Sequence, residues 1–286
     1  MNVDRFRVRH NDRRALARHH PDESGPFTGK EDAQAHLLKG LSRLAERQQL
    51  LYAQDRYALL LIFQGMDAAG KDSAIRHVMS GVSPQGIDVH SFKQPSAEEL
   101  DHDYLWRSVK VLPERGRIGV FNRSYYEEVL VVRVHPHVLA AQKLPAPLVT
   151  KRIWAERYED INSFERHLSR NGTVIRKFFL HVSRGEQKRR LLERLDDPAK
   201  NWKFSATDLL DRGDWNQYQE VYRKALAATS SPHAPWYVVP ADHKWFAQAL
   251  VADVIVDALE ELDLSFRTVS APQRRALAAA RRKLKG

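Results

Sequence analysis

The sequence predicts an α/β fold: a doubly wound parallel sheet of five strands with helices on both faces. Five apolar runs alternate along the chain with helical patterns. The first run, residues 58–63, has no polar position, which is typical of a strand buried on both faces of a sheet. No linker rich in glycine, proline or serine separates the five runs, so we expect a single domain.

Composition bounds the class of protein. A chain of 286 residues can bury one large α/β core or two small ones. No apolar run reaches the roughly 18–20 residues that span a membrane, and the N-terminus lacks the core of a signal peptide. The absence of cysteine excludes disulfides and thiolate metal sites. We therefore expect a soluble cytoplasmic protein with no membrane partner.

The formal net charge of +10 points to a polyanionic partner. The last fifteen residues, however, contain six lysines and arginines and no acid, so this segment accounts for more than half of the excess. We expect residues 266–286 to form a basic tail. We also expect residues 1–28, which are polar and show no sustained period, to form an extended, solvated arm.

The first folded elements follow the arm. Leucines in residues 31–54 recur at helical spacing and predict a helix that packs beside the first strand. After the strand at 58–63, residues 65–72 read Gly-Met-Asp-Ala-Ala-Gly-Lys-Asp, and residues 73–79 begin a second helix. This order of strand, glycine-bounded loop, lysine and helix is typical of a phosphate loop.

The residues of this loop suit the binding of phosphate. Its glycines let successive backbone N–H groups face phosphate oxygens, and the helix N-terminus and Lys71 add positive charge. Asp72 stands where the usual residue is Ser or Thr. A glycine-flanked turn without a ligand is the alternative, which the lysine and the helix behind it disfavour. The candidates for phosphate binding in the loop are Gly65, Ala68, Ala69, Gly70, Lys71, Asp72 and Ser73.

The next segment leads to a second group of polar residues. Residues 87–92 predict a strand, the capping-box pattern at Ser96 predicts a helix through Val109, and residues 118–121 predict a third strand. That strand ends in Asn122-Arg123-Ser124. Because ligands of open parallel sheets bind at the carboxyl ends of the strands, Asn122 and Arg123 should lie near the phosphates. An ordinary strand-end cap is the alternative.

The remaining elements close the sheet. They are a helix over 153–168, a strand over 173–182, a helix that Ser183 caps, a strand over 236–239 and an amphipathic helix over 246–262. The polar segment 196–215 lies where nucleotide kinases carry a mobile lid, and a plain surface loop is equally compatible with it. His135 and His137 have no third ligand nearby, so we interpret them as structural.

Several motifs in the same order resemble the polyphosphate kinase 2 family. They are the loop at 65–72, Phe92-Lys93-Gln94-Pro95, Phe121-Asn122-Arg123-Ser124, Phe178-Phe179-Leu180-His181, Asp197-Pro198-Ala199-Lys200-Asn201-Trp202-Lys203 and Ala234-Pro235-Trp236. The resemblance runs from about residue 30 to 262. It implies a phosphate-loop kinase of the thymidylate-kinase-like fold, with residues 29–265 as the catalytic domain. The implied reaction is magnesium-dependent phosphoryl transfer between inorganic polyphosphate and a nucleotide, with Mn²⁺ as a substitute.

One departure from the family pattern narrows the expected substrates. Many members of the family have Asp-Arg-Ser where this chain has Asn122-Arg123-Ser124. Asn-Arg-Ser followed by Tyr-Tyr-Glu-Glu is similar to the class III subgroup, which phosphorylates both nucleoside monophosphates and diphosphates. The expected partners are therefore polyphosphate, AMP, ADP and ATP, in a homo-oligomer that binds no nucleic acid.

Charge assigns the roles within the site. A carboxylate beside phosphates requires a cation between them, so we expect Asp67 to bind magnesium and to orient the acceptor, with the amide oxygen of Asn122 as a further ligand. Lys71 would neutralise the transferred group, and Arg123 the charge of the transition state. Glu127 is a candidate for contacting the nucleotide or a second metal ion, and a plain position on a surface helix is the alternative. Asp72 could hold magnesium through water or cap the helix.

Polyphosphate is a flexible polyanion, so its site should be a basic channel, and its binding should weaken with salt. We assign to this channel Arg176, Lys177, Lys200, Lys203 and Arg212, and to the nucleotide Lys93, Arg107, Asn122, Arg123 and Glu127. Each cation taken alone is more often a solvated surface charge. Two other functions stay open: an ATP-dependent kinase of a small acceptor and a basic nucleic-acid-binding protein.

Overall fold

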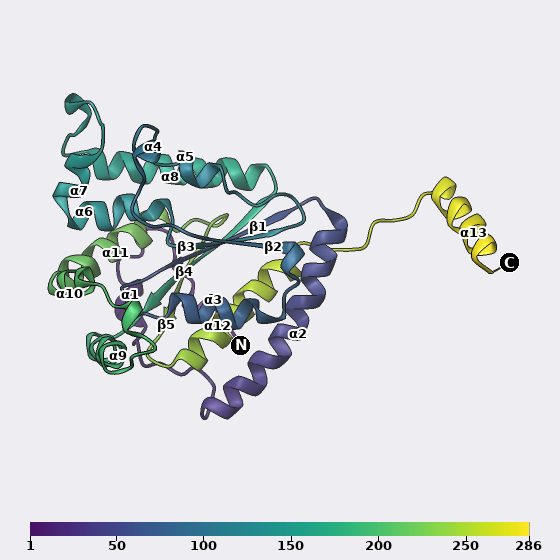
Figure 1. Cartoon of the computed structure of the whole chain (residues 1–286), viewed down its shortest axis with the longest axis horizontal. Helices are drawn as coiled ribbons and strands as arrows, with labels where there is room; N and C mark the ends of the chain where they lie inside the picture. Colours follow the sequence, from purple (N-terminus) through teal and green to yellow (C-terminus); the bar gives the residue numbers. More distant parts are fainter. Residues whose placement is uncertain (286) are drawn as a thin grey trace.

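The computed structural model describes residues 1–285 and contains the predicted five-stranded sheet, all of whose strands are parallel. The strand order is β2-β3-β1-β4-β5 (Figure 1). The strands are β1 (Ala58–Gln64), β2 (Ile87–Ser91), β3 (Ile118–Asn122), β4 (Thr173–His181) and β5 (Trp236–Pro240). Every residue of β1 and β5 is buried, which explains their uninterrupted apolar sequences.

Helices cover both faces of the sheet. The longer ones are α2 (Lys30–Gln54), α3 (Lys71–Val78), α8 (Ile153–Arg170), α9 (Arg184–Asp196), α10 (Ala206–Gly213), α11 (Trp215–Thr229), α12 (Lys244–Glu260) and α13 (Ala271–Lys285). The short ones are η1 (Val3–Phe6), α1 (Ala15–Arg18), η2 (Met79–Gly81), η3 (Pro84–Gly86), α4 (Ala97–Leu100), α5 (Trp106–Val109), η4 (Tyr125–Val129), α6 (Val131–Val134), α7 (Pro136–Ala141), η5 (Ala146–Leu148) and η6 (Asn201–Lys203).

The two helical layers meet opposite faces of the sheet. Helices α2, α3 and α12 lie on one face, and α8 and α11 lie on the other (Figure 1). The connection after β1 passes through α3, whereas the connection after β3 passes through α8. These neighbouring strands therefore send their chains to opposite faces, and a crevice forms where they diverge. In the sheet register Phe63 pairs with Asn122, so both strands end at this crevice.

Three details differ from the sequence-based expectations, and the first is α12. This helix is not amphipathic: it is buried nearly all round, because α2 and α3 cover the sides that the sheet leaves open. The second is the helix expected from Ser96 to Val109. It divides into α4 and α5, because the Asp103 carboxylate accepts a hydrogen bond from the Leu105 N–H and starts a new turn.

The third difference is the N-terminal arm, which is not a solvated tail. Val3, Phe6 and Val8 are buried, and Val8 donates its N–H to the Trp236 carbonyl of β5. His19 is buried as well, with its ring 5.1 Å from that of Phe6. The arm shows no period because only single apolar side chains enter the core. Within residues 1–285, no helix is long and apolar enough to cross a membrane.

Candidate active site

The predicted phosphate loop joins β1 to α3 in a conformation that its sequence explains. Gly65 and Gly70 have positive φ angles of 156° and 105°. A Cβ atom on Gly65 would lie 2.8 Å from the Leu180 carbonyl oxygen, so no larger residue fits there. Ala68 also has a positive φ, of 60°, which is uncommon for alanine and places the backbone of the loop under strain.

Helix α9 holds this strained loop from behind. The buried guanidinium of Arg190 donates hydrogen bonds to the carbonyl oxygens of Ala68 and Ala69, at 3.1 and 2.9 Å. It also donates to the carbonyl oxygens of Ala241 and Asp242, which follow β5. Gln187, one turn earlier in α9, donates to the Asp67 carbonyl at 3.1 Å. Because these bonds engage carbonyls, they leave the N–H side of the loop for an anion.

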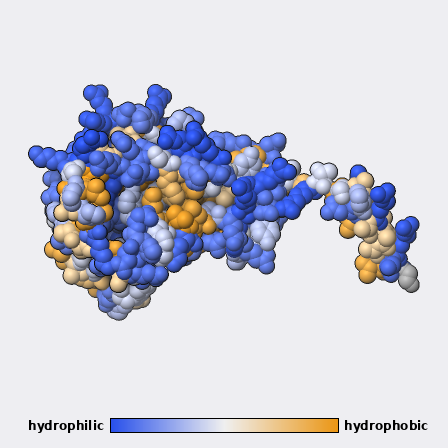
Figure 2. All heavy atoms as spheres, turned by 90° about the horizontal axis from the view of Figure 1, so that it is seen from above, coloured by the Kyte–Doolittle hydropathy of each residue, from blue (hydrophilic) through white to orange (hydrophobic). Residues whose placement is uncertain are grey.

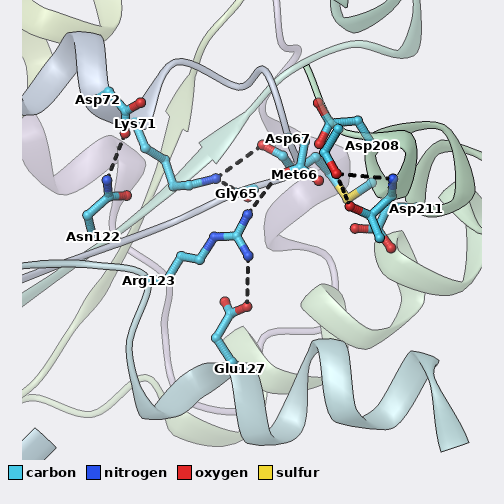
Figure 3. Close-up of polar contacts among 12 residues, drawn as sticks. Gly65, Met66, Asp67, Lys71, Asp72, Asn122, Arg123, Glu127, Asp208 and Asp211 are labelled. Carbon is cyan, nitrogen blue, oxygen red and sulfur yellow. Dashed lines mark hydrogen bonds and ion pairs between the residues drawn. The ribbon is translucent and has the colours of Figure 1, made fainter. Parts of the chain in front are cut away.

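Four charged side chains gather in front of the loop (Figure 3). Arg123 Nη2 lies 2.9 Å from Asp67 Oδ1, and Arg123 Nη1 lies 3.6 Å from Glu127 Oε2. Lys71 Nζ donates to the Gly65 carbonyl at 2.6 Å. The predicted proximity of the third strand's end to the phosphate loop is confirmed by these contacts. The parallel register explains it, since Arg123 comes one residue after the strand-end pair of Phe63 and Asn122.

Burial and mutual charge shift the pKa values of this group. Glu127 and, to a smaller extent, Asp67 raise the pKa of Arg123. Burial lowers the pKa of Lys71, and the neighbouring Arg123 lowers it further. Burial raises the pKa of Glu127, while Arg123 opposes that shift. Two cations held this close to each other favour an anion between them, which is the electrostatic requirement of a phosphate site.

Asn122 and Asp72 form the other side of the site. Asn122 Nδ2 donates to Asp72 Oδ1 at 2.7 Å and lies 3.4 Å from Ser91 Oγ. Asn122 Oδ1 is buried and accepts no hydrogen bond within residues 1–285. A buried oxygen without a donor costs free energy unless a ligand satisfies it. This oxygen and the Asp67 carboxylate are hard donors of the kind that magnesium prefers.

The protein alone supplies too few ligands for a closed metal cage. No three His, Cys, Asp or Glu side chains in the described chain are arranged to hold a metal ion. This fits magnesium in kinases, which is commonly bound by one or two protein oxygens together with substrate phosphates and water. The donor set of Asp67 and Asn122 therefore fits a magnesium ion that arrives with the substrate.

The segment predicted as a lid packs against the site. Asp211 of α10 lies beside Asp67, and both burial and the Asp67 carboxylate raise its pKa. The His135 ring contacts Asp211 Oδ1 at 2.8 Å and the Tyr218 hydroxyl at 3.1 Å, which supports the structural role expected for this histidine. Asp208 is buried and pairs with Arg194 of α9 at 3.1 Å. The mobility of this segment stays a prediction.

The structure contradicts a phosphate-binding role for Lys177. Its ammonium is fully buried in β4 and lies 2.5 Å from Glu165 Oε2. It also donates to the Tyr126 hydroxyl and the Thr229 carbonyl, both at 2.8 Å. Burial lowers its pKa to about 8. No polyanion can reach this group, because strand alternation directs the side chain into the core rather than into a channel.

The assignment of Arg176 is wrong for a related reason. Its side chain is buried on the opposite face of β4 and pairs with Glu261 at 2.6 Å, just after α12. In the sheet register Arg176 lies beside Leu61, well before the carboxyl end of β1. Sequence alone shows two adjacent cations in a strand, and only the packing shows that both have structural partners.

The other predicted cations keep their assignments as predictions. Lys93 is exposed, and its carbonyl accepts a hydrogen bond from the buried Arg107 at 2.8 Å. Lys200 and Lys203 are exposed on the segment expected to act as a lid. Arg212 donates to the Arg184 carbonyl and to Gln187 Oε1, so it ties α10 to α9.

Sequence reasoning missed the residues that support the loop, namely Gln187 and Arg190. A signal for them exists. Gln187 lies three positions before Arg190 and four before Leu191, so the three share a helical face on which a helix that packs on a sheet normally presents apolar residues. Polar side chains on such a face indicate buried polar partners.

Fold and site together define a class. A doubly wound parallel sheet with a glycine-lysine loop at its point of divergence and an arginine at the adjacent strand end is a phosphate-loop kinase. The family model described as polyphosphate kinase 2 matches residues 28–267. This chain belongs to the polyphosphate kinase 2 family. It is thus a transferase of the kinase type that acts on polyphosphate and phosphorylates nucleotides.

Individual relatives agree with this assignment. An ADP-polyphosphate phosphotransferase of Rhodopseudomonas palustris is 52% identical over 266 residues, which cover 92% of each chain. An AMP/ADP-polyphosphate phosphotransferase of Meiothermus ruber is 44% identical, over 92% of this chain and 95% of that one. The crystal structure of polyphosphate kinase 2 from Arthrobacter aurescens TC1 matches with a TM-score of 0.86 and 40% identity, over 96% of this chain and 95% of that chain.

Proposed function

We propose that this chain transfers the terminal phosphoryl group of inorganic polyphosphate to both AMP and ADP, giving ADP and ATP in a reversible reaction. The observation that carries the proposal is the pair of cations, Lys71 and Arg123, beside the strained loop. The Asn122-Arg123-Ser124 motif and the names of the two relatives support a dual acceptor range of the class III kind.

The reaction breaks the bond between the terminal phosphorus of polyphosphate and its bridging oxygen. A new bond forms between that phosphorus and a terminal phosphate oxygen of the nucleotide, and polyphosphate becomes one phosphate shorter. Such a transfer needs little covalent help, since positioning and charge neutralisation supply most of the rate. The loop N–H groups and Lys71 would bind the transferred group, and Arg123 would stabilise the charge of the transition state.

The acidic residues have a separate task. A bound magnesium ion would neutralise charge between donor and acceptor phosphates, and Asp67 and Asn122 are the residues that would hold it. With Asp67 engaged in this way, Arg123 would be free to contact phosphate, and its second partner Glu127 would keep it positioned. Arg123 would thus keep a carboxylate partner, Glu127, both before and after substrate binds, and this partner would maintain the orientation of its guanidinium.

The test measures ADP and ATP formed by the purified protein with magnesium, polyphosphate and either AMP or ADP as the sole acceptor. We expect product from both acceptors, and loss of at least about 10³-fold in kcat/KM for Lys71→Ala and Asp67→Asn. Lys188→Ala, which changes an exposed lysine of α9, is the matched control and should retain full activity.

The possible failures are distinct. Product from ADP but not AMP would refute the dual acceptor range and leave polyphosphate-dependent transfer intact. No product above the Lys71→Ala background from either acceptor would refute the proposal. Turnover of ATP with a nucleoside or sugar, without use of polyphosphate, would identify an ATP-dependent kinase instead.

A further inference from the structure

The terminal helix α13 stands clear of the rest of the molecule (Figures 1 and 2). None of its residues 271–285 is buried, and Leu284 is 89% exposed. The helix also lies beyond residues 28–267, which match the family model. The family model therefore does not cover this helix.

Local signals are sufficient to start this helix. Ser270 donates its N–H to Gln273 Oε1 at 2.9 Å, and the Gln273 N–H lies 3.4 Å from Ser270 Oγ. This reciprocal pair is a capping box, followed by a segment rich in alanine and arginine, which both favour helices. A helix that forms without packing keeps its side chains available to a partner.

Five of the six charged residues of α13 form a stripe along one side of the helix, whereas Lys283 lies on the opposite side. Arg274, Arg281 and Lys285 are separated by seven and four positions, so they lie on the same face, and Arg275 and Arg282 flank them. The stripe is about 16 Å long, at a rise of about 1.5 Å per residue. No acidic side chain in residues 1–285 pairs with any of these five. Such a stripe carries a dense, uncompensated positive charge.

We propose that α13 binds polyphosphate and captures the polymer for the active site. This inference rests on the proposed function, which makes a linear polyanion the substrate. A row of cations complements a row of phosphates, and release of the polymer's counterions favours the complex. A membrane surface fits less well. Membrane-surface helices carry a broad apolar face with bulky side chains, whereas α13 has only Leu277 and Leu284 among alanines.

The distance between the active site and α13 determines how long a polyphosphate must be to contact both. Helix α12 begins beside the phosphate loop, where Gln248 Nε2 lies 3.5 Å from Ser73 Oγ. From Gln248 the helix continues for twelve residues to Glu260, so its end lies about 18 Å from this contact. Arg267 then pairs with Asp55 at 2.6 Å, which anchors the connection to α13. Only a long polyphosphate can contact the active site and α13 together, and it would gain from a raised effective concentration.

The experiment compares KM for long-chain polyphosphate and for tripolyphosphate, with ADP as acceptor. The variant Arg274→Gln/Arg281→Gln/Lys285→Gln removes the three cations at the centre of the stripe and keeps Arg275 and Arg282. We expect its KM for the long chain to rise about tenfold at physiological salt, with kcat and the tripolyphosphate KM unchanged. The slope of log affinity against log salt should fall in magnitude by about 2, since three phosphate contacts are lost.

The matched control Leu277→Ala/Leu284→Ala keeps every charge and should behave as the unmodified protein. An unchanged KM for the long chain in the stripe variant would overturn the proposal. So would an equal effect of the leucine control, which would indicate apolar docking on a membrane or a second copy. Fluorescence anisotropy with end-labelled long-chain polyphosphate measures the affinity for the polymer independently of phosphoryl transfer. A stripe-dependent affinity without transfer would refute only the proposed function.

Discussion

At the end of β3, the backbone of Arg123 adopts a φ of 63°, in the left-handed region that arginine seldom occupies. Its N–H donates to the Phe63 carbonyl at 3.0 Å, which extends the pairing of β1 and β3 by one residue. The resulting turn directs the guanidinium toward Asp67 and Glu127. Strain at such a residue costs about 1–3 kcal/mol and persists here because the sheet and two carboxylates hold the arginine in place.

The buried ion pair of Lys177 and Glu165 stabilises the segment that follows Arg123. Glu165 Oε1 accepts hydrogen bonds from the hydroxyls of Tyr125 and Tyr126, at 2.9 and 2.8 Å. These tyrosines begin η4, two and three residues after Arg123, so the pair fixes the segment that carries Arg123 and Glu127. Lys177, which we predicted to bind polyphosphate, thus helps to position Arg123 and Glu127 through its buried contacts.

His181 gives the fold a dependence on acid. Burial lowers its pKa to about 4, while the unfolded chain binds the proton near pH 6.5. Stability should therefore fall as the pH decreases from 6.5 toward 4, by up to about 1.4 kcal/mol per pH unit, because only the unfolded state accepts the proton. Urea unfolding at pH 7 and pH 5 measures the effect. In His181→Asn the difference should shrink, whereas the control His167→Asn, at an exposed position of α8, should retain it. Equal pH dependence in all three proteins would contradict the assignment.

At the scale of elements, α9 couples the phosphate loop to the segment after β5. Ser183 Oγ accepts the Glu186 N–H at 3.1 Å and starts the helix, so that Gln187 and Arg190 face the loop. Glu186 pairs with Arg190 Nε at 2.7 Å and orients its guanidinium. The strained backbone at Ala68 is thus held by a rigid helix rather than by the loop itself.

Replacing Arg190 tests this role of α9. Arg190→Met should lower the free energy of unfolding by about 2–4 kcal/mol, because four buried carbonyls lose a donor. It should also raise the KM for polyphosphate, since the loop loses its support. Chemical denaturation and steady-state kinetics measure the two effects. Lys188→Met, at an exposed position of the same helix, is the control and should change neither. A variant Arg190→Met with normal stability and KM would show that the loop holds its shape unaided.

At the scale of the whole molecule, the N-terminal arm closes the core far from its position in the sequence. The isolated bridge between Arg7 and Tyr237 adds the arm to β5, and the N-terminal ammonium pairs with Asp253 of α12 at 2.6 Å. Phe6 inserts between His19 and Phe246, with ring centroids 5.1 and 5.8 Å away. The arm is therefore part of the folded unit that includes the catalytic domain.

Phe6→Ala should destabilise the protein by about 3–5 kcal/mol, because a buried aromatic side chain is lost and leaves a cavity. Thermal and urea unfolding measure the change, and kcat below the unfolding temperature should stay close to that of the unmodified protein. Arg13→Ala, at an exposed position of the same arm, should unfold as the unmodified protein does. A loss below about 1 kcal/mol for Phe6→Ala would show that the arm packs only loosely.

The sequence by itself determined the strands and the phosphate loop. Both are local: the run of 58–63 needs burial on two faces, and the loop at 65–72 needs its two glycines for positive φ. Asn122 and Arg123 were also predictable, because parallel strands of similar length end at the same edge of a sheet. Their place at the strand end indicated proximity to the phosphate loop, and the order of motifs indicated the family.

Tertiary structure alone decided what each remaining charge does. Lys177 lies within β4 and Lys71 begins α3, yet the sequence assigns both to phosphate; in the structure Lys177 neutralises a buried glutamate, and Lys71 faces the phosphate loop. Arg190 supports that loop from a helix more than a hundred residues away in sequence. The role of a charged side chain depends on the partners that burial brings within a few ångströms of it. These partners are set by the packing of helices and strands, which no local sequence pattern records.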